Sequence, residues 1–333
     1  MMKKRELTTI AIKLVAACVL FTGAAGTFGI ASAQTKLKWA HVYETSEPFH
    51  KWSVWASDEI KKRTNGRYEV QVFPASSLGK ESDINQGLTL GTVDIILSGS
   101  SFAGNTYKPL AVTYFPFIFR DAEHQLKYAK SDVFKELAKD YDAKSGNHIT
   151  ALTYYGARHV TSNKQVRTPA DMKDLKIRVP DAPAYLAFPK SLGANATPIA
   201  FAEVYLALQN GTVDAQENPL PTILAKKFFE VQKNISLTGH IVDSLLTIVG
   251  GSVWSKLSDA DKKIFSEVMQ DAAEKAGRDI IASETRLVEE FKQKGINVIT
   301  VDKNAFREAV LKNAKPTDYG YRQIDYDRII AIK

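Results

Sequence analysis

The stretch Leu175-Lys176-Ile177-Arg178-Val179-Pro180 alternates apolar and basic residues and stops at a proline, which predicts a short strand followed by a turn. Residues 200–210 then place apolar side chains at helical spacing before Gly211, which predicts a short amphipathic helix with a glycine stop. Residues 213–219 predict a second strand. A strand, a helix and a strand within about 45 residues indicate a βαβ-like unit, which is typical of parallel sheets.

Arg178 is the residue of this unit that points to a function. It lies near the end of the first strand, and open α/β sheets bind ligands outside the carboxyl ends of their strands. A guanidinium there can hold a carboxylate through two parallel charge-assisted hydrogen bonds. The alternative is an arginine that pairs with a nearby Asp or Glu at the surface. The local pattern leaves both interpretations open.

The segments around this unit resemble the solute-binding proteins of TRAP transporters of the DctP type, which deliver organic acids to a membrane permease. The resemblance is carried by long, ordered motifs that cover most of the chain, namely 156–164, 176–180, 193–194, 197–209, 214–219, 227–233 and His240. It implies an α/β fold of the periplasmic binding protein type. Such a fold has two lobes, a ligand cleft between the lobes and a long helix that spans both.

Residues 1–33 have the pattern of a cleavable secretory signal. A basic start leads into an apolar run at 14–21, and Ala31-Ser32-Ala33 is a small-residue cleavage site. A lipoprotein signal around Cys18 is the alternative, but the apolar stretch continues well past that residue. We therefore expect an exported, periplasmic protein.

Charge and cysteine content narrow the class of protein. The chain has 333 residues and a net charge of +7, of which the four basic residues and one acidic residue of 1–33 contribute +3, which leaves +4. This excess suits anionic ligands and is too dispersed to indicate a nucleic-acid partner. Cys18 is the only cysteine, so the exported chain would have no thiol or disulfide chemistry. About 300 residues are enough for two α/β lobes.

Periodicity along the chain predicts how the lobes are built. Alternating or continuously apolar segments predict strands at 37–42, 68–73, 93–97, 150–155 and 237–251. Ser258 begins a helical pattern that continues to about residue 294. At 1.5 Å per residue, some 35 residues make a helix of roughly 50 Å, which is longer than one lobe is wide.

We divide the chain accordingly. Lobe one is predicted to contain 34–155, with about 245–285 returning to it. Lobe two is predicted to contain 156–244 with about 286–333, and the long helix at about 259–294 bridges the two lobes. Hinge rotation would close the cleft around one ligand.

The sequence does not favour an enzyme. Its six histidines are scattered, and it contains no His-Glu-x-x-His, Gly-x-Ser-x-Gly, phosphate loop or Cys-x-x-Cys motif. We expect no metal site and no cofactor. Asp214 and Glu217 could form a catalytic pair, but we expect Asp214 to pack at a strand end and Glu217 to form a structural ion pair, directed towards His240.

The resemblance assigns ligand contacts in lobe two. It implies that Arg178 makes the bidentate contact with the ligand carboxylate and that Arg158 is a second cation near the same ligand. It further implies that Asn218 is an amide donor and that Phe201 packs against an apolar face of the ligand.

Further candidates come from neighbouring loops and strands. Glu44 and Ser76 follow the first two strands, and Ser100 lies in a serine-rich turn after the third. Glycine and serine after a strand can present N–H and hydroxyl donors to an anion, although they also form ordinary turns. Tyr155 and Gln216 lie beside the lobe-two motifs and complete the predicted set.

The ligand class is predicted from two segments that differ among members of the family. Sialate-binding members of the family have a glutamate and an arginine after the strand that ends at Leu97, where this chain has Ser98-Gly99-Ser100-Ser101-Phe102. That turn looks closer to binders of diketogulonate or uronates, whereas Ala40-His41-Val42 looks closer to C4-dicarboxylate binders. We therefore expect a sugar acid such as a hexuronate, with a C4-dicarboxylate as the alternative. The expected partners are this ligand and the TRAP membrane permease, and we expect a monomer.

Overall fold

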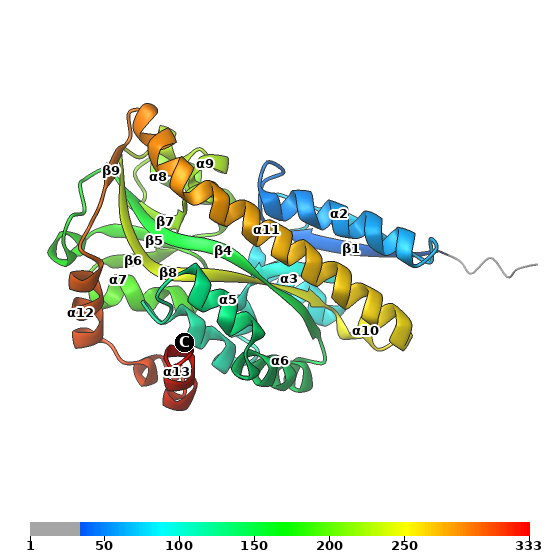
Figure 1. Cartoon of the computed structure of the whole chain (residues 1–333). Helices are drawn as coiled ribbons and strands as arrows, with labels where there is room; N and C mark the ends of the chain where they lie inside the picture. The colour runs from blue at the N-terminus through cyan, green and yellow to red at the C-terminus, as the bar shows by residue number, and fades with distance from the viewer. Residues whose placement is uncertain (1–33) are drawn as a thin grey trace, which may run out of the picture. The chain divides into compact units, whose positions relative to one another are not determined.

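The structure, a computed structural model, describes residues 34–333, so the predicted signal peptide lies outside the described residues. Residues 35–333 form one compact unit around a nine-stranded mixed sheet (Figure 1). The strand order is β2-β1-β3-β8-β4-β7-β5-β6, and β9 also pairs with β8. The strands are β1 (Thr35–His41), β2 (Tyr68–Phe73), β3 (Ile95–Gly99), β4 (His148–Ser162), β5 (Lys176–Val179), β6 (Asn195–Pro198), β7 (Ala215–Pro219), β8 (Asn234–Val249) and β9 (Asn297–Ile299).

Helices follow most of the strands, as in other α/β proteins. They are α2 (Pro48–Arg63), α3 (Glu81–Leu90), α4 (Ser100–Ala103), α5 (Ala122–Lys130), α6 (Asp132–Ser145), α7 (Ala187–Ser191), α8 (Val204–Gln209), α9 (Leu220–Ala225), α10 (Gly251–Trp254), α11 (Asp259–Gln293), α12 (Lys303–Asn313) and α13 (Gln323–Ile330). Within residues 34–333, none of these helices has the length and apolar character that crossing a membrane requires.

The two longest strands, β4 and β8, connect the halves of the sheet. They run antiparallel, with His148 opposite Val249 at one end and Ser162 opposite Asn234 at the other. β3 pairs with the last part of β8, and β7 pairs with the last part of β4. Each long strand therefore belongs to both halves, and the strand predicted at 150–155 is only the first part of β4.

The crossing region of β4 contains a backbone irregularity. The register between β4 and β8 shifts at Tyr154/Gly156 and again at Arg158/Val160. Gly156 has a φ of 124°, and a Cβ placed on it would lie 2.7 Å from the Cβ of Pro219. Only glycine fits both the backbone conformation and the space, so the position where the chain passes between the halves depends on it.

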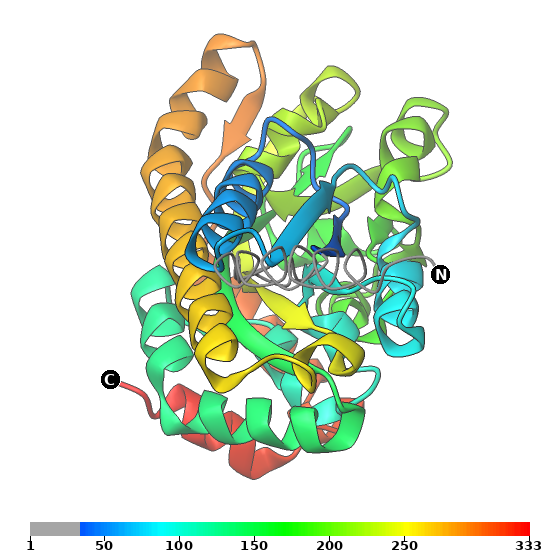
Figure 2. The ribbon, with the colours of Figure 1, turned by 90° about the vertical axis from the view of Figure 1, so that its right-hand side faces the viewer.

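The helix α11 lies where the sequence predicts the bridging helix. Ser258 is its N-cap, and its side chain accepts a hydrogen bond from the backbone N–H of Asp261 at 3.1 Å. Figures 1 and 2 show α11 beside α2, and its buried face continues from Phe265 near its start to Phe291 near its end. A helix of this length packs against elements of both halves, although the exact lobe boundaries stay a prediction.

The predicted βαβ-like unit is present, with one addition. β5 and β7 are parallel, with Ile177 opposite Ala215, and α8 lies between them in the sequence. The sequence analysis missed β6, because Asn195–Pro198 is short and polar. The serine-rich turn also differs from its prediction: Ser98 and Gly99 belong to β3, where β8 pairs with them, and Ser100 begins α4.

Candidate functional site

Arg178 projects from β5 and is almost completely buried, with 1% of its surface exposed. Its Nε and Nη2 donate hydrogen bonds to the backbone carbonyl of Ile199, at 2.9 and 2.7 Å. Its Nη1 has no hydrogen-bond partner among the described residues. Burial lowers the pKa of Arg178 to about 10, and the neighbouring Arg158 adds to this effect. A buried guanidinium in this state favours any anion that can reach it.

Arg158 projects from β4 and is equally buried, but protein groups satisfy it. Its Nε and Nη2 donate to the carboxylate of Glu217, and its Nη1 donates to Asp243 Oδ2 at 2.8 Å. Its Nη2 also donates to the backbone carbonyl of Glu217 at 2.7 Å. Burial alone would lower the pKa of Arg158, but Glu217, Tyr185 and Asp243 raise it well above its ordinary value. Its contact with a ligand stays a prediction.

The contact expected between Glu217 and His240 is present in this cluster as a hydrogen bond, because burial lowers the pKa of His240 and so disfavours a charged imidazole. His240 Nε2 lies 3.2 Å from Glu217 Oε2, and the His240 ring stacks on Phe188. Burial would raise the pKa of Glu217, but Arg158 and His240 lower it to about 2. Glu217 is therefore the carboxylate that fixes Arg158, and this arrangement gives no reason to regard it as a catalytic group.

The sequence analysis missed Glu81, the first residue of α3. Its Oε1 accepts hydrogen bonds from Ser98 Oγ at 2.9 Å and from Gly99 N at 2.7 Å. Both of these hydrogen bonds go to Oε1 and neither goes to Oε2. Burial raises the pKa of Glu81 to about 7, and Arg178 is close enough to oppose the shift. The sequence indicated Glu81 only weakly, because Glu81 directly follows Lys80 in the loop that contains the predicted ligand residue Ser76.

Aromatic side chains surround the two arginines. The Arg178 guanidinium lies 6.0 Å from the ring centre of Phe201, which also contacts Tyr43 with ring centres 6.3 Å apart. The Arg158 guanidinium lies 4.9 Å from the ring of Tyr185. Phe201 thus lies close to the predicted carboxylate-binding arginine, and its contact with a ligand stays a prediction.

Three predicted residues form a continuous hydrogen-bonded chain. Tyr155 Oη donates to Asn218 Oδ1 at 3.4 Å, and Asn218 Nδ2 donates to Gln216 Oε1 at 2.6 Å. Gln216 Nε2 then donates to Thr161 Oγ1 at 3.0 Å, and Thr161 donates to Gln232 Oε1 at 3.1 Å. The structure therefore brings Tyr155, Asn218 and Gln216 together in one buried, directional network.

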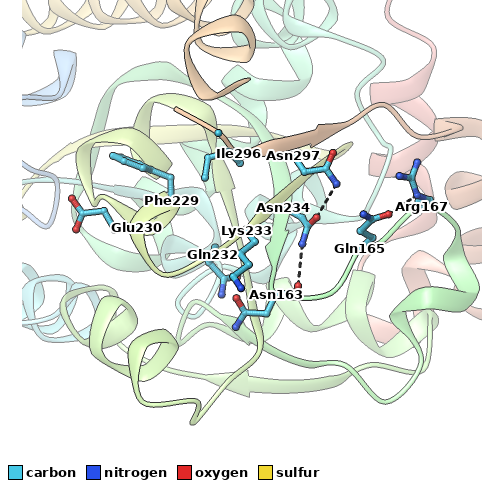
Figure 3. A pocket seen from close by; sticks show the side chains of 11 residues that line it. Asn163, Gln165, Arg167, Phe229, Glu230, Gln232, Lys233, Asn234, Ile296 and Asn297 are labelled. Atoms are coloured by element: carbon cyan, nitrogen blue, oxygen red, sulfur yellow. Dashed lines mark hydrogen bonds between the residues drawn. The ribbon is translucent and has the colours of Figure 1, made fainter. Parts of the chain in front are cut away.

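This chain ends at a polar surface groove of about 740 Å³ (Figure 3). Gln232 lines the groove together with Asn163, Gln165, Asn234 and Asn297. Asn234 is held by hydrogen bonds to the carbonyl of Asn163, at 3.1 Å, and from Asn297, at 2.9 Å. None of the nine predicted ligand residues lies in this groove.

The remaining three candidates make their hydrogen bonds to groups other than Arg178. Glu44 Oε1 accepts a hydrogen bond from Lys226 Nζ at 2.7 Å, and Lys226 follows α9. Ser100 Oγ lies 2.9 Å from Ser244 Oγ and is buried against β8. Ser76 has a φ of 60°, and its backbone N–H donates to the carbonyl of His41 at 3.3 Å. Ligand contacts by these residues stay predictions.

No group of three or more His, Cys, Asp or Glu side chains within residues 34–333 has the arrangement of a metal site. Carboxylates of the site are engaged instead by arginine, by hydroxyls and by backbone N–H groups. The site therefore contains one buried cation, Arg178, whose Nη1 has no hydrogen-bond partner among the described residues and whose surroundings are aromatic rings and hydroxyl groups.

Comparisons with known proteins agree with this description. The family model of bacterial extracellular solute-binding proteins, family 7 (DctP), matches residues 39–317. The sialic acid-binding periplasmic protein SiaP of Vibrio cholerae is 36% identical over 277 residues, which are 83% of this chain and 86% of SiaP. The 2,3-diketo-L-gulonate-binding periplasmic protein YiaO of Escherichia coli is 35% identical over 276 residues, 80% of this chain and 83% of YiaO.

Solved structures of TRAP periplasmic solute-binding proteins share the fold. One from Polaromonas, with bound D-erythronate, is 33% identical, has a TM-score of 0.86, and aligns over 90% of this chain and 99% of its own. One from Roseobacter denitrificans, with bound L-galactonate, is 30% identical with a TM-score of 0.83, over 90% and 98%. One from Sulfurospirillum deleyianum, with bound succinate, is 28% identical with a TM-score of 0.84, over 90% and 100%.

These likenesses confirm the two-lobed α/β fold that the sequence predicts. The matched residues 39–317 include both long strands and α11. The chain belongs to the DctP family of bacterial extracellular solute-binding proteins, the periplasmic components of TRAP transporters.

Proposed function

We propose that this protein captures a hydroxylated monocarboxylate, a sugar acid, and delivers it to a TRAP membrane permease. The observation that carries the proposal is the unpaired Nη1 of Arg178. A buried guanidinium without an anion is costly, and a ligand carboxylate would supply both charge and hydrogen-bond acceptors. Phe201 beside the guanidinium would pack against the carbon skeleton of the ligand.

The surroundings of Arg178 favour hydroxyl groups on the rest of the ligand. The hydrogen bonds from Ser98 and Gly99 both go to Glu81 Oε1, and a ligand hydroxyl would donate to Oε2. Gly99 adds room, because a Cβ there would lie 3.1 Å from the hydroxyl of Tyr114 and 3.4 Å from that of Tyr185. The space beside Gly99 is therefore lined by the hydroxyl groups of Tyr114 and Tyr185.

The same carboxyl group disfavours the alternative ligand. A C4-dicarboxylate would bring a second negative charge towards Glu81, and like charges at close range repel. The relatives support both classes: D-erythronate and L-galactonate are bound in two structures, and succinate is bound in another. A C4-dicarboxylate thus remains the second candidate, and Glu81 is the residue that separates the two.

The setting of the function follows from the family. Export through the signal at 1–33 would place the chain in the periplasm, as a monomer with no cofactor. The ligand would bind between lobe one, 34–155 with about 245–285, and lobe two, 156–244 with about 286–333. The family consists of binding proteins, and we propose that this chain likewise has no enzymatic activity.

The test is a thermal-shift and calorimetry screen of residues 34–333 with D-erythronate, L-galactonate, D-galacturonate, succinate and sialate. Binding stabilises the folded protein by about 4 kcal/mol at a thousandfold excess over Kd, so a true ligand gives a clear shift. We expect a sugar acid to bind and Arg178→Ala to abolish the response. Arg167→Ala, which removes an exposed arginine, is the matched control and should leave binding intact.

Three outcomes would contradict the proposal. Binding that survives Arg178→Ala would move the carboxylate elsewhere. Succinate as the tightest ligand would favour the second candidate. The sugar-acid proposal expects Glu81→Gln to strengthen the binding of succinate, whereas the second candidate expects the order of affinities to stay the same in this variant. Chemical conversion of the ligand during the incubation would show an enzyme.

A further inference from the structure

Glu47 is a buried carboxyl at the contact between the first strand-helix connection and α9. It directly precedes α2 and has 1% of its surface exposed. Its Oε2 accepts a hydrogen bond from the backbone N–H of Glu44 at 2.8 Å. Its Oε1 accepts one from Thr222 Oγ1 at 2.7 Å. The predicted lobes place Glu47 in lobe one and Thr222 in lobe two, so this hydrogen bond crosses the cleft.

Thr222 connects Glu47 to the predicted ligand residues. Its Oγ1 lies 3.3 Å from Tyr155 Oη, which in turn donates to Asn218 Oδ1. Asn218 Nδ2 donates one of its two hydrogens to Gln216. Glu47 therefore stands at the head of the chain that contains Tyr155, Asn218 and Gln216, although it is not itself beside Arg178.

A threonine hydroxyl has one hydrogen, so Thr222 can donate to Glu47 or to Tyr155 but not to both. When Glu47 accepts, Tyr155 Oη receives no hydrogen from Thr222 and keeps an open acceptor position. When Glu47 moves away or carries a proton, the Thr222 hydroxyl can donate its hydrogen to Tyr155 Oη instead. The acceptor position of Tyr155 Oη is then occupied. The state of one carboxyl thus sets whether Tyr155 Oη has an acceptor position open to a ligand.

We propose that Glu47 is a positioning residue of the ligand site, which acts through Thr222 to set whether the hydroxyl of Tyr155, the hydrogen-bond neighbour of Asn218, can accept a hydrogen bond from a ligand. The inference deepens the proposed function and rests on it. It assigns a role in ligand selection to a residue outside the aromatic and arginine cluster. It also makes the hydrogen bonds that Tyr155 accepts depend on the contact between the predicted lobes.

Charged neighbours of Glu47 determine how it titrates. Burial raises the pKa of Glu47 to about 7 from an ordinary value of 4.5, Glu44 and Tyr155 lie on one side, and Lys226 lowers it. An opening that exposes Glu47 to water would return its pKa towards 4.5, so closure would take up a proton between these values. Affinity should therefore be highest below pH 4.5 and should decline as the pH rises to about 7.

The experiment compares wild type, Glu47→Gln, Thr222→Val and Thr222→Ser with L-galactonate as the probe. Calorimetry between pH 5 and 8 should show an affinity decrease of about 70-fold for wild type, as pKa values of 4.5 and about 7 imply. Glu47→Gln should remove this decrease, apart from the part that Glu81 contributes. Thr222→Val keeps the carboxyl that titrates, so its affinity should still decrease with pH, and Thr222→Ser, which keeps the hydroxyl, should resemble wild type.

A second readout follows the side-chain amide signal of Asn218 in ¹⁵N-labelled protein, with and without L-galactonate. The signal should shift with pH in wild type and Thr222→Ser, and it should lose that shift in Glu47→Gln and Thr222→Val. A shift of equal size in all four proteins, or in none, would overturn the role of Glu47. Failure of wild type to bind any acid of the panel would instead overturn the proposed function.

Discussion

Arg158 and Arg178 lie in neighbouring parts of one sheet and are equally buried, yet their surroundings differ in kind. Arg158 donates to two carboxylates and a carbonyl of the protein. Arg178 donates to a single carbonyl and leaves Nη1 free. The pKa shifts follow, upward for Arg158 and downward for Arg178. Burial alone thus does not distinguish a structural arginine from a ligand-binding one. The difference is whether the protein itself supplies a carboxylate to the guanidinium or leaves that position to a ligand.

The largest effect should come from removing Arg158. Arg158→Met leaves Glu217 and Asp243 buried without their cation, which should lower the free energy of unfolding by about 3–5 kcal/mol. Urea unfolding of the ligand-free protein measures this. The triple variant Arg158→Met, Glu217→Met, Asp243→Leu should recover much of the loss. A single variant as stable as wild type would show that Arg158 is not held by its carboxylates.

Removing Arg178 should have the opposite signature. Arg178→Met takes away a buried cation that has no ion-pair partner, so the free energy of unfolding without ligand should be unchanged or higher. Affinity for the bound sugar acid should fall about 100-fold, since hydrogen bonds to charged groups contribute about 1.5–3 kcal/mol each. Calorimetry and unfolding on the same sample test both. If Arg178→Met lost as much stability as Arg158→Met, the distinction between a structural and a ligand-binding arginine would be wrong.

Two acids extend the comparison to pH. Glu217 has a pKa lowered to about 2, chiefly by Arg158, so its contribution to stability is present above 4.5 and is lost as the pH falls towards 2. Glu81 has a pKa raised to about 7 by burial, so its contribution is present below 4.5 and is lost as the pH rises towards 7. Each effect is at most about 3 kcal/mol.

Unfolding of Glu217→Gln and Glu81→Gln across this range measures the two effects. The deficit of Glu217→Gln should shrink in acid, and Glu81→Gln should become more stable than wild type at about pH 8. The same sign for both variants would contradict the assignment of one acid as paired and the other as unpaired.

The smallest effect should come from the ion pair between Glu44 and Lys226. It is partly exposed, so its coupling energy should be about 0.2–1 kcal/mol and should fall with added salt. A double-mutant cycle with Glu44→Gln and Lys226→Met, read by ligand affinity, measures it. Lys80–Asp181, at 3.7 Å and about half exposed, is the comparison and should couple less. Equal coupling at high salt would exclude an electrostatic origin.

Sequence periodicity was sufficient for much of the fold. β5, β7 and α11 were predicted close to their observed bounds, because alternation, helical spacing and caps are local signals. β6 was not found, since Asn195–Pro198 is polar and becomes a strand only by pairing with β5. The extent of β4 was underestimated for the same reason, because β8 lies far along the chain.

The site was predictable only in part. Arg178 could be chosen from its place at a strand end, but the partners of Arg158 are 59 and 85 residues away, and no local pattern reveals them. Asp243 was the available clue, as a lone acid within an apolar, β-branched segment. Glu47 and Thr222 are 175 residues apart, so their hydrogen bond is visible only in the folded chain.

The contact between Glu44 and Lys226 also has a practical use. These side chains meet from segments 182 residues apart, and residues 34–333 contain no cysteine. A cysteine introduced at either position would be the only thiol within residues 34–333, so a single dye could be attached there without side reactions. Opening or closing around that point would change the polarity that the dye experiences. The protein could thereby serve as an optical sensor for the acid it binds.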